Sequence, residues 1–468
     1  MALGNDHALG VRHLHASLAA RGVAASMLFV EPDYRQLSHG PWFSADIDSL
    51  LAFLGPGDRT LVGLSLVTLT FPQAVALSSA LRARTSAKIL WGGVHPTLCP
   101  EACLPHADAL CLGDGEEVLA VYLDHLAGKP LEKPVPGLLL AGSPVPRQPM
   151  RAWRAELTSL PAPSYEAADA WHIRRGRFYR GDPLRGETRH HLIASRGCPL
   201  ACSFCCNERL QGALGPDRRY RTLAPRRVLD DLHAVLRERP GISRVMFWDD
   251  IFYPSQAQFL EFCELYEQEL GLPFFCHVHP QWYDRARLER LRRCGCEAVG
   301  IGLQCGSELL RREVYRRPES NLELAALCAE AADLGLDLQY DLIVDSPFEN
   351  DADRMTTVDF LFRLPRPARL FLYPYTEFPG TVLGEGSWTG SAVVRSSTHA
   401  EDRVGREFQV ALSGMACWGK RTRALARWVR HRRRPLARRS VIALARILRV
   451  VHLGLNPGRR LSWRAWPS

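Results

Sequence analysis

The sequence lacks several features that define membrane, secreted and repetitive proteins. No uninterrupted apolar run reaches the length of about 20 residues that a bilayer-crossing helix needs. No N-terminal stretch joins a basic start to an apolar core and a small-residue cleavage site. No short-period repeat and no low-complexity segment interrupts the chain. These absences favour a globular protein of the cytoplasm.

The fourteen cysteines lack the export signal that usually accompanies a disulfide framework. They are spread along 468 residues, so we expect reduced thiols rather than disulfides. Cys111, Cys263 and Cys328 lie in apolar runs, where a buried and unreactive thiol is the expected state. Cysteines that carry chemistry must therefore be found by their spacing.

Acidic residues are absent from the last part of the chain. From Phe408 onward there are fifteen Lys or Arg and no Asp or Glu, so the rest of the chain is net acidic although the total charge is +9. Trp463 and Trp466 follow an apolar stretch with interspersed arginines. We favour a solvated helical face with a disordered end. Peripheral contact with an anionic membrane surface is the second interpretation, and nucleic-acid binding is the least favoured of the three.

Residues 1–145 predict an α/β domain. Apolar strands are expected at residues 25–30, 61–69, 88–91 and 107–112, with helices at 11–18 and 73–84, and a further strand is expected before Gly4. Short apolar strands that alternate with helices favour a parallel, doubly wound Rossmann-like sheet. Such sheets bind ligands at the carboxyl ends of their strands. The candidate ligand-binding residues at these ends are Ser65, Thr68, Gly92, Gly93, His95, Gly113 and Gly115.

Three further segments follow. Residues 146–188 are rich in proline and charge, which indicates a linker. Residues 189–385 repeat the strand–helix alternation, and six units of this kind predict a partial (β/α)6 TIM-like barrel. Residues 386–468 predict a basic, mainly helical extension. The barrel strands are expected at residues 191–195, 244–249, 274–278, 298–303, 338–344 and 369–374.

The most informative motif lies directly after the first barrel strand. Cys198, Cys202 and Cys205 have the spacing C-x3-C-x2-C. Three thiolates on one short loop suit three irons of a cubane cluster and leave the fourth iron open to a small chelating molecule. The alternative is a closed zinc site, which needs a fourth ligand such as Cys206 or His190.

This loop, at the end of the first strand of a barrel, resembles the radical S-adenosylmethionine (SAM) superfamily. The resemblance implies that Cys198, Cys202 and Cys205 bind a [4Fe-4S] cluster and that the open iron chelates the methionine part of SAM. It also implies that an electron from the cluster cleaves SAM to a 5′-deoxyadenosyl radical, which abstracts hydrogen from an unactivated carbon. Cys206 is then a neighbour of the cluster rather than a ligand.

Further segments resemble the cobalamin-binding branch of that superfamily, which includes an anaerobic cyclase and many methyltransferases. They are residues 247–250, 302–308, 340–347 and 378–381, each at or after a predicted barrel strand. Barrels place their sites at the carboxyl ends of the strands. The resemblance therefore places Asp249, Asp250, Gln304 and Ser307 at the SAM or substrate site.

The N-terminal domain resembles the cobalamin-binding domain of the same branch. The residues that carry this resemblance are 63–65, 92–97 and 113–117, whose glycines would admit a corrin onto the strand ends. The D-x-H-x-x-G signature of cobalamin mutases is absent, so His95 is not expected to ligate cobalt. The alternative is a degenerate domain that only packs on the barrel.

The resemblance implies cobalamin-dependent methyl transfer to a carbon of a small-molecule or natural-product substrate, with an electron donor such as flavodoxin or ferredoxin. A radical cyclase or rearrangement enzyme is the alternative within the same branch. A tRNA methylthiotransferase is less favoured, because Cys99, Cys103 and Cys111 do not form its second cysteine triad. A non-catalytic cobalamin or iron–sulfur sensor is the alternative of another class, but a sensor would not need a barrel with polar strand ends.

Overall fold

The structure, a computed structural model, describes most of the 468 residues. They form two compact units, and each is described by itself. The first unit comprises Met1–Leu200, Cys205–Ile242 and Phe378–Glu385, and the second comprises Ala201–Phe204, Ser243–Glu377 and Gly386–Ser468. The residues outside the description are 4–7, 31–43, 55–60, 132–133, 146–156, 166–167, 175–176, 215–219, 385–402, 418–419, 430–437 and 446–468.

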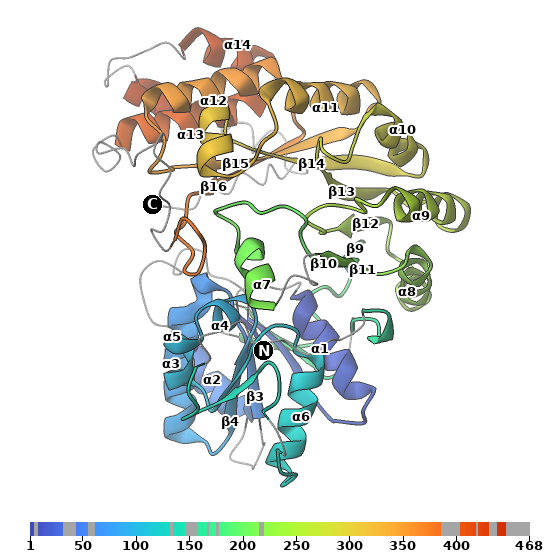
Figure 1. Ribbon diagram of the computed structural model, residues 1–468, viewed down its shortest axis with the longest axis vertical. Coiled ribbons are helices and arrows are strands. Elements are labelled where there is room, and N and C mark those ends of the chain that lie inside the picture. The colour runs from blue at the N-terminus through green and yellow to red at the C-terminus, as the bar shows by residue number, and fades with distance from the viewer. Residues whose placement is uncertain are drawn as a thin grey trace. The chain divides into compact units, whose positions relative to one another are not determined.

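An eight-stranded sheet forms the centre of the first unit (Figure 1). Its strand order is β6-β5-β4-β3-β1-β2-β7-β8. All neighbours from β5 to β7 pair in parallel, whereas β6 and β8 run antiparallel at the two edges. The strands are β1 (Ala2–Leu3), β2 (Met27–Val30), β3 (Leu61–Ser65), β4 (Lys88–Gly92), β5 (Ala109–Cys111), β6 (Leu138–Leu140), β7 (Ala170–Arg174) and β8 (Arg177–Arg180).

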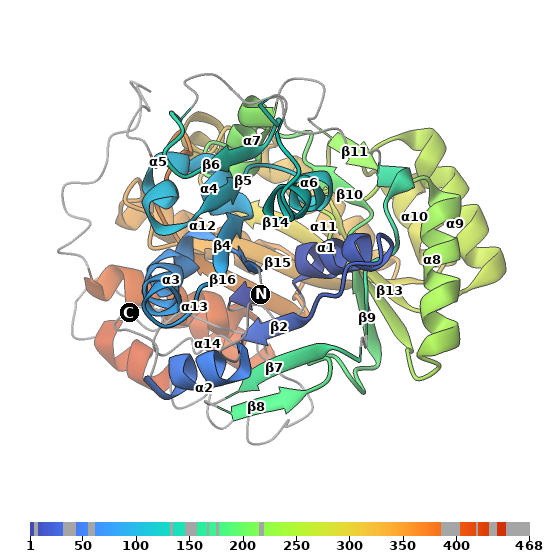
Figure 2. The same cartoon turned by 90° about the horizontal axis from the view of Figure 1, so that it is seen from below.

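Helices cover both faces of this sheet, which is why its central strands are short and apolar. Helices α1 (Leu9–Ala19) and α6 (Glu116–Leu126) lie on one face (Figures 1 and 2). Helices α2 (Ser44–Leu54) and α3 (Phe71–Arg84) lie on the other. All four residues of β2 and all three of β5 are buried. The predicted doubly wound sheet is confirmed.

Several elements of the first unit differ from the sequence prediction. Helix α2 and strand β6 were not predicted, and β7 and β8 lie within the stretch that was assigned to the linker. The predicted strand at residues 61–69 ends at Ser65, and a 3-10 turn, Thr68–Thr70, follows it. Strand β8 is largely exposed, so it lacks the apolar run from which strands are predicted. The strand expected before Gly4 is β1, which has only two residues. Strand β1 is nevertheless central, because it pairs with both β2 and β3.

The first unit also contains the elements that flank the cysteine motif. Strand β9 (Arg189–Leu192) precedes a two-stranded antiparallel sheet of β10 (Ser195–Gly197) and β11 (Tyr220–Thr222). Helix α7 (Cys206–Leu214) lies between these two strands in the chain and packs against α4 (Val94–Leu98). Helix α8 (Pro225–Glu238) follows β11. The cysteine motif thus begins and ends on elements of the first unit.

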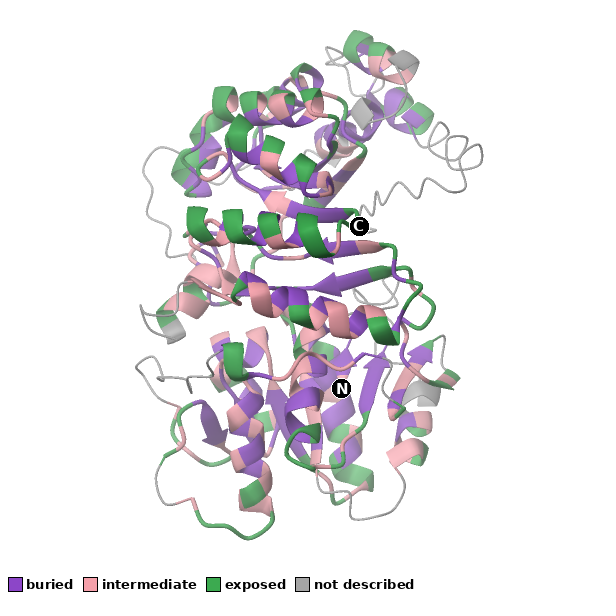
Figure 3. Cartoon of the chain, turned by 90° about the vertical axis from the view of Figure 1, so that its right-hand side faces the viewer, coloured by how far each residue is buried: buried purple, intermediate pink, exposed green. Residues whose placement is uncertain are grey.

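Parallel strands form the sheet of the second unit. In order they are β12 (Arg244–Phe247), β13 (Phe274–Val278), β14 (Cys296–Gln304), β15 (Asp337–Val344) and β16 (Arg369–Pro374). The helices α9 (Gln256–Glu269), α10 (Arg285–Arg293), α11 (Asn321–Asp333) and α12 (Asp351–Arg363) alternate with them (Figure 1). Together with β9, a strand lies at each of the six predicted barrel positions. Figure 3 shows these strands mainly buried and the outward helix faces exposed.

The face of this sheet that α9 and α10 cover, called the outer face here, is an aromatic core. Phe247 on β12 packs edge-to-face on Phe262 of α9 and on Phe274 of β13. Cys263 and Cys328 are buried in the second unit, as Cys111 is in the first. Their predicted burial is confirmed. Apolar residues of β12 and β13 thus bury one face of each strand and leave the opposite face, the inner face, for polar groups.

Part of the basic C-terminal region folds onto α12. Helices α13 (Arg403–Cys417) and α14 (Lys420–Val429) follow the barrel, as the helical pattern predicted. Arg423 donates hydrogen bonds to the last carbonyls of α12, and Arg438 forms an ion pair with Asp351 at its first turn. The solvated interpretation of the tail is therefore wrong for these arginines. In the described part of the chain, no helix is long and apolar enough to span a membrane.

Candidate active site

The cysteine motif occupies a short loop between β10 and α7. Cys198 and Cys202 are buried and Cys205 is half-buried, and none of the three is in a disulfide. Gly197, with a φ of 85°, ends β10 in a left-handed conformation that turns the chain into the loop. The side-chain amide of Gln211 on α7 donates to the carbonyl of Cys198. Helix α7 therefore holds the start of the loop that precedes it.

The middle of the loop belongs to the second unit. The Ser203 hydroxyl donates to the carbonyl of Val314, and the Ser203 amide donates to that of Tyr315 at 3.3 Å. Phe204 packs edge-to-face on the ring of Tyr315, with ring centres 5.4 Å apart. Val314 ends a single π-helical turn, Leu310–Val314. This arrangement fixes the backbone around Cys202.

A buried arginine lies beside the central cysteine. Arg317 Nη1 is 3.9 Å from Cys202 Sγ, and its Nε donates to Glu319 at 2.6 Å. Burial disfavours the charged guanidinium, but Cys202 and Glu319 outweigh it and raise the pKa of Arg317. A fixed positive charge favours the thiolate form, which is the form that binds iron. Arg317 was not predicted from the sequence, because it follows the motif by more than a hundred residues.

The loop fits a cubane cluster through its donor set: three cysteine thiols on eight residues, with a buried cation at the central one. Among the described residues, no three His, Cys, Asp or Glu side chains are arranged around a single ion. A cubane needs no such arrangement, because each thiolate binds a different iron. The assignment of Cys198, Cys202 and Cys205 as ligands remains a prediction.

The predicted cobalamin-site residues lie together at one edge of the first sheet. Ser65 ends β3, Gly92 ends β4, and Gly113 and Gly115 follow β5, so all four are at the carboxyl ends of adjacent parallel strands. The loops are tied to one another, since the Thr97 hydroxyl accepts a bond of 3.0 Å from the Gly113 amide. The sequence pattern thus placed these residues at the edge where doubly wound sheets bind ligands.

Gly93 shows why this edge needs glycine. Its φ is 99°, and a Cβ there would lie 2.7 Å from the carbonyl oxygen of Leu66. The backbone after β4 therefore packs directly against the backbone after β3. Val67 and Leu69, also after β3, expose about half and more than a third of their surface, at 50% and 38%. An apolar edge with tightly packed glycine backbone fits a large flat cofactor such as a corrin.

Thr68 and His95 form a contact within this edge. The Thr68 hydroxyl is 3.2 Å from His95 Nδ1, and the His95 ring packs on Phe71 with centres 4.7 Å apart. His95 is buried, and burial lowers its pKa. Its Nε2 has no hydrogen-bond partner among the described residues. The imidazole is thus held as a neutral group within the loop packing.

An ion-pair cluster that the sequence analysis did not predict joins this edge to the cysteine motif. Arg196, two residues before Cys198, binds Asp114 at 3.0 Å and also binds Glu116. Arg221 on β11 binds the other oxygen of Asp114 at 2.8 Å. Despite burial, the two arginines hold the pKa of Asp114 below its usual value. Asp114 and Glu116 belong to the glycine-rich segment after β5, and this segment was the sequence feature that could have pointed to the ion-pair cluster.

The predicted SAM-site residues of the second unit lie at two strand ends. Asp249 is buried and Asp250 is exposed, directly after β12. Gln304 ends β14 with a φ of 61°, and Ser307 is buried just beyond it. Gly306 lies between them and accepts no side chain, because a Cβ would be 2.5 Å from the backbone of Thr357. Strand β13 lies between β12 and β14 in the sheet. The roles of Asp249, Asp250, Gln304 and Ser307 at the SAM or substrate site stay predictions.

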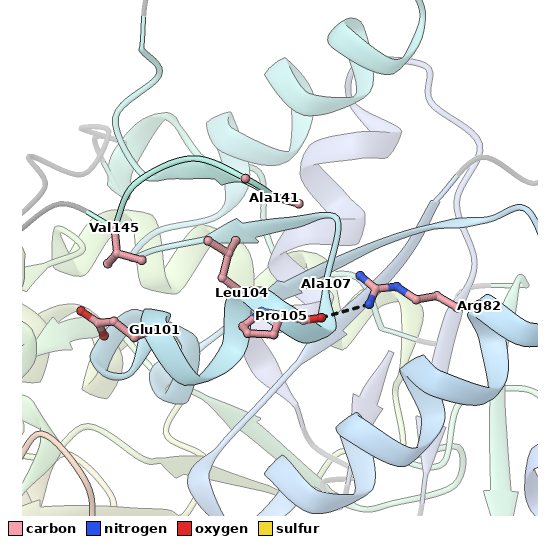
Figure 4. Close-up of a pocket in the computed structure, with 8 residues that line it drawn as sticks. Arg82, Glu101, Leu104, Pro105, Ala107, Ala141 and Val145 are labelled. Carbon is pink, nitrogen blue, oxygen red and sulfur yellow. Dashed lines mark hydrogen bonds between the residues drawn. The ribbon is translucent and has the colours of Figure 1, made fainter.

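The first unit also contains a shallow pocket (Figure 4). Ala107 precedes β5 and Ala141 follows the antiparallel β6, so the pocket is at the amino end of β5, opposite the glycine-rich edge. Arg82 in its wall donates to the carbonyl of Pro105 at 3.1 Å. No cysteine or histidine lines it, and we assign it no role. It is lined by Arg82, Glu101, Leu104, Pro105, Ala107, Ala141, Gly142 and Val145.

Two family models match the chain. The model of the radical SAM superfamily matches residues 192–361, which include the cysteine loop and the barrel strands through β15. The model of the B12 binding domain matches residues 2–123, which include β1 to β5 and the glycine-rich edge.

The curated relatives include methyltransferases and a cyclase. The chain is 24% identical to an uncharacterized methyltransferase of Pyrococcus horikoshii, over 70% of this chain and 69% of that protein. It is 25% identical to cytidylyl-2-hydroxyethylphosphonate methyltransferase of Streptomyces wedmorensis, over 55% and 52%. It is 26% identical to the anaerobic magnesium-protoporphyrin IX monomethyl ester cyclase of Cereibacter sphaeroides, over 54% and 42%. The chain thus spans about half the length of the last two.

Solved structures share the fold over nearly the whole chain. The radical SAM methyltransferase TsrM of Kitasatospora setae, with cobalamin and a [4Fe-4S] cluster bound, aligns with a TM-score of 0.62 and 15% identity, over 96% of this chain and 98% of that one. The cobalamin-dependent radical enzyme OxsB aligns with a TM-score of 0.59 and 15% identity, over 98% and 75%. Together with the two family models, this likeness identifies the chain as a radical SAM protein with an N-terminal B12-binding domain, whose implied cofactors are SAM, a [4Fe-4S] cluster and cobalamin.

Proposed function

We propose that this protein transfers a methyl group to a carbon atom of a small-molecule or natural-product substrate. One observation carries the proposal: both ends of the cysteine loop are held on the glycine-rich edge of the B12-binding domain. Arg196, before the loop, binds Asp114 and Glu116, and α7, after the loop, packs on α4. A protein that only cleaved SAM would not need its cluster loop built onto a cobalamin-binding edge.

Each group of residues has a defined part in this function. The cluster and cobalamin, when bound, supply the electron transfer and the methyl carriage. Cys198, Cys202 and Cys205 hold the cluster, and Arg317 keeps a positive charge at Cys202. The edges of β3, β4 and β5 receive the corrin through their glycine backbone. We further propose a cytoplasmic location and a flavodoxin- or ferredoxin-type electron donor.

Cleavage of SAM tests the radical half of the proposal. Anaerobically reconstituted, reduced protein is expected to hold about four irons and to form 5′-deoxyadenosine. Cys202→Ala is expected to abolish both, whereas the matched control Cys206→Ala, one residue after the motif, is expected to keep both. Wild-type iron content and cleavage in Cys202→Ala would show that the motif is wrongly assigned.

A cyclase is the second candidate, because an anaerobic cyclase is among the relatives. Isotope labelling separates the two. With SAM labelled in its methyl group, a methyltransferase places the label in the product or on the bound cobalamin, whereas a cyclase leaves it in methionine. A protein that binds both cofactors but forms neither 5′-deoxyadenosine nor a methylated product would instead be a sensor.

A further inference from the structure

Three polar side chains meet on the inner face of the second unit's sheet. His277 lies on β13, and Gln339 and Asp341 lie on β15, with β14 between them. Gln339 Nε2 donates to Asp341 Oδ1 at 3.3 Å, and His277 Nε2 is 3.9 Å from Asp341 Oδ2. Polar groups rarely gather on the inner face of a sheet without a partner to bind.

Glycines on the intervening strand make this meeting possible. Gly300 is the register partner of both His277 and Gln339, and Gly302 is the partner of Asp341. A Cβ on Gly300 would lie only 2.4 Å from the His277 ring. Glycine weakens a strand interior and often marks the close approach of a ligand. The bare backbone of β14 therefore lets the rings of His277 and Phe275 lie directly over Gly300, and it forms the floor beneath the polar groups.

Aromatic side chains border this floor on both sides. Trp248, after β12, has its ring centre 5.5 Å from that of Phe275 and 5.9 Å from that of His277. On the far side, Phe371 and Tyr373 of β16 are stacked with centres 6.1 Å apart, and Tyr373 exposes 48% of its surface. Flat rings at both margins of a glycine floor suit a flat ligand, since aromatic pairs add stacking to the area that they bury.

The polar groups have unused hydrogen-bonding capacity and carry at most one negative charge, that of Asp341. Gln339 Oε1 is buried without a partner among the described residues. The side chains of His277 and Asp341 keep 21% and 16% of their surface open. Burial raises the pKa of Asp341 to about 7, and burial lowers the pKa of His277 to about 4. Near neutral pH the group therefore favours a neutral polar ligand over an ion.

The polar group is also near the cluster loop. Gly302, the register partner of Asp341, accepts a hydrogen bond of 3.2 Å from Arg317 through its carbonyl. The same guanidinium contacts Cys202. Arg317 thus contacts both Cys202, a predicted cluster ligand, and β14, the strand beneath the polar side chains. All three belong to the second unit.

We propose that His277, Asp341 and Gln339 form a substrate subsite that binds a neutral, planar ring compound through an N–H or O–H donor, with Trp248 and Phe275 beside the ring. The proposal rests on the proposed function, because it takes the inner face of the barrel as the place where the substrate reacts. It names the class of that substrate. Acceptor oxygens of Asp341 and Gln339 select the donor, and the aromatic rings on both sides select the flat shape.

Two probes that differ by one hydrogen-bond donor test the subsite. The reconstituted holoprotein is titrated with indole and with 1-methylindole, and binding is followed by ligand-detected NMR. We expect indole to bind about five- to tenfold more tightly, the effect of one hydrogen bond. The preference should vanish in Asp341→Leu and persist in Asp341→Asn, which keeps a polar group, and in the control Asp337→Asn at the exposed start of β15.

Gly300→Ala gives a second, independent test, because the added methyl group would lie within 3 Å of the His277 and Phe275 rings and must displace them. We expect it to weaken the binding of both probes alike. Equal binding of indole and 1-methylindole to the wild type, or an unchanged preference in Asp341→Leu, would overturn the subsite. Formation of 5′-deoxyadenosine is measured in the same samples. Cleavage without probe discrimination overturns the subsite alone, whereas loss of cleavage in the wild type overturns the proposed function.

Discussion

Arg196 and Arg221 lie directly opposite each other across the β10–β11 pair, and both bind Asp114. Like charges at opposed positions of two strands repel each other. One carboxylate from the loop after β5 neutralises the pair and draws the two strands to the glycine-rich edge of the B12-binding domain. The strand that leads into the cysteine loop is therefore positioned by a side chain of the cobalamin-binding domain.

Removal of that carboxylate should loosen the cysteine loop. Asp114→Asn leaves two partly buried arginines opposed, so we expect a loss of stability on the order of 3 kcal/mol, as for other broken buried pairs. The reconstituted variant should lose iron to a chelator faster than the wild type. The control is Glu117→Gln, which breaks an exposed pair with Arg21 and should cost less than about 1 kcal/mol. Equal iron loss in both variants would rule out the positioning role.

The charge beside Cys202 should affect the cluster itself. Arg317→Met removes the guanidinium that contacts Cys202 Sγ, so the reduced cluster should lose electrostatic stabilisation and its reduction potential should fall. Arg317→Lys, which keeps the charge, should shift the potential less. Arg312→Met, at an exposed ion pair five residues earlier in the chain, serves as the control. Spectroscopic redox titration measures all three, and identical potentials would contradict the electrostatic role.

Two glycines of the B12-binding domain allow a matched comparison. Gly93→Ala places a methyl group 2.7 Å from the Leu66 carbonyl at a φ of 99°, so the edge must distort and cobalamin binding should weaken at least tenfold. Gly10→Ala, in α1 with open space around it, should stabilise the fold by up to about 1 kcal/mol and leave binding unchanged. Absorbance titration with hydroxocobalamin distinguishes them. Cobalamin affinity that is unchanged in Gly93→Ala would argue against this edge as the corrin site.

Stability should fall between pH 5 and pH 8. Burial raises the pKa of Glu349 to about 8, whereas an unfolded glutamate titrates near 4.3, so over this interval the folded state binds more protons than the unfolded state. The contribution of Glu349 to the free energy of unfolding is therefore largest at low pH and is lost as the pH rises through the folded pKa. In Glu349→Gln the free energy of unfolding, measured by urea titration, should decrease less between pH 5 and pH 8, by on the order of 3 kcal/mol. Glu313→Gln, at an exposed site, should leave the profile unchanged.

The basic tail should have two separable roles. Truncation after residue 419 removes Arg423, Arg427 and Arg438, which bind the two ends of α12, and should lower the melting temperature by several degrees, since each bond to a charged group contributes about 1.5–3 kcal/mol. Truncation after residue 445 keeps these contacts and should leave stability unchanged.

Vesicle flotation at low and high salt tests the second role. If the tail contacts membranes, loss of residues 446–468 should weaken binding to anionic vesicles at low salt, and salt should screen what remains. Full-length protein that stays away from the vesicles at low salt would exclude the membrane interpretation.

The sequence by itself determined the features that depend on local spacing. The cysteine loop was recognisable because its three thiols lie within eight residues. The central strands of both sheets were recognisable because burial on both faces demands short apolar runs such as β2 and β5. Glycine-rich segments marked the strand ends for another local reason. Gly93 and Gly113 have a positive φ, which glycine adopts without steric strain.

Only the tertiary structure decided which distant groups meet. Asp114 and Arg196 are 82 residues apart, and Cys202 and Arg317 are 115 apart, so no periodicity connects them. The same holds for His277 and Asp341, which touch because the strand between them carries glycine. Long-range pairs depend on strand order and register, which local propensity does not encode. The edge strand β8 was missed for that reason: its pairing with β7, not its own largely exposed residues, makes it a strand.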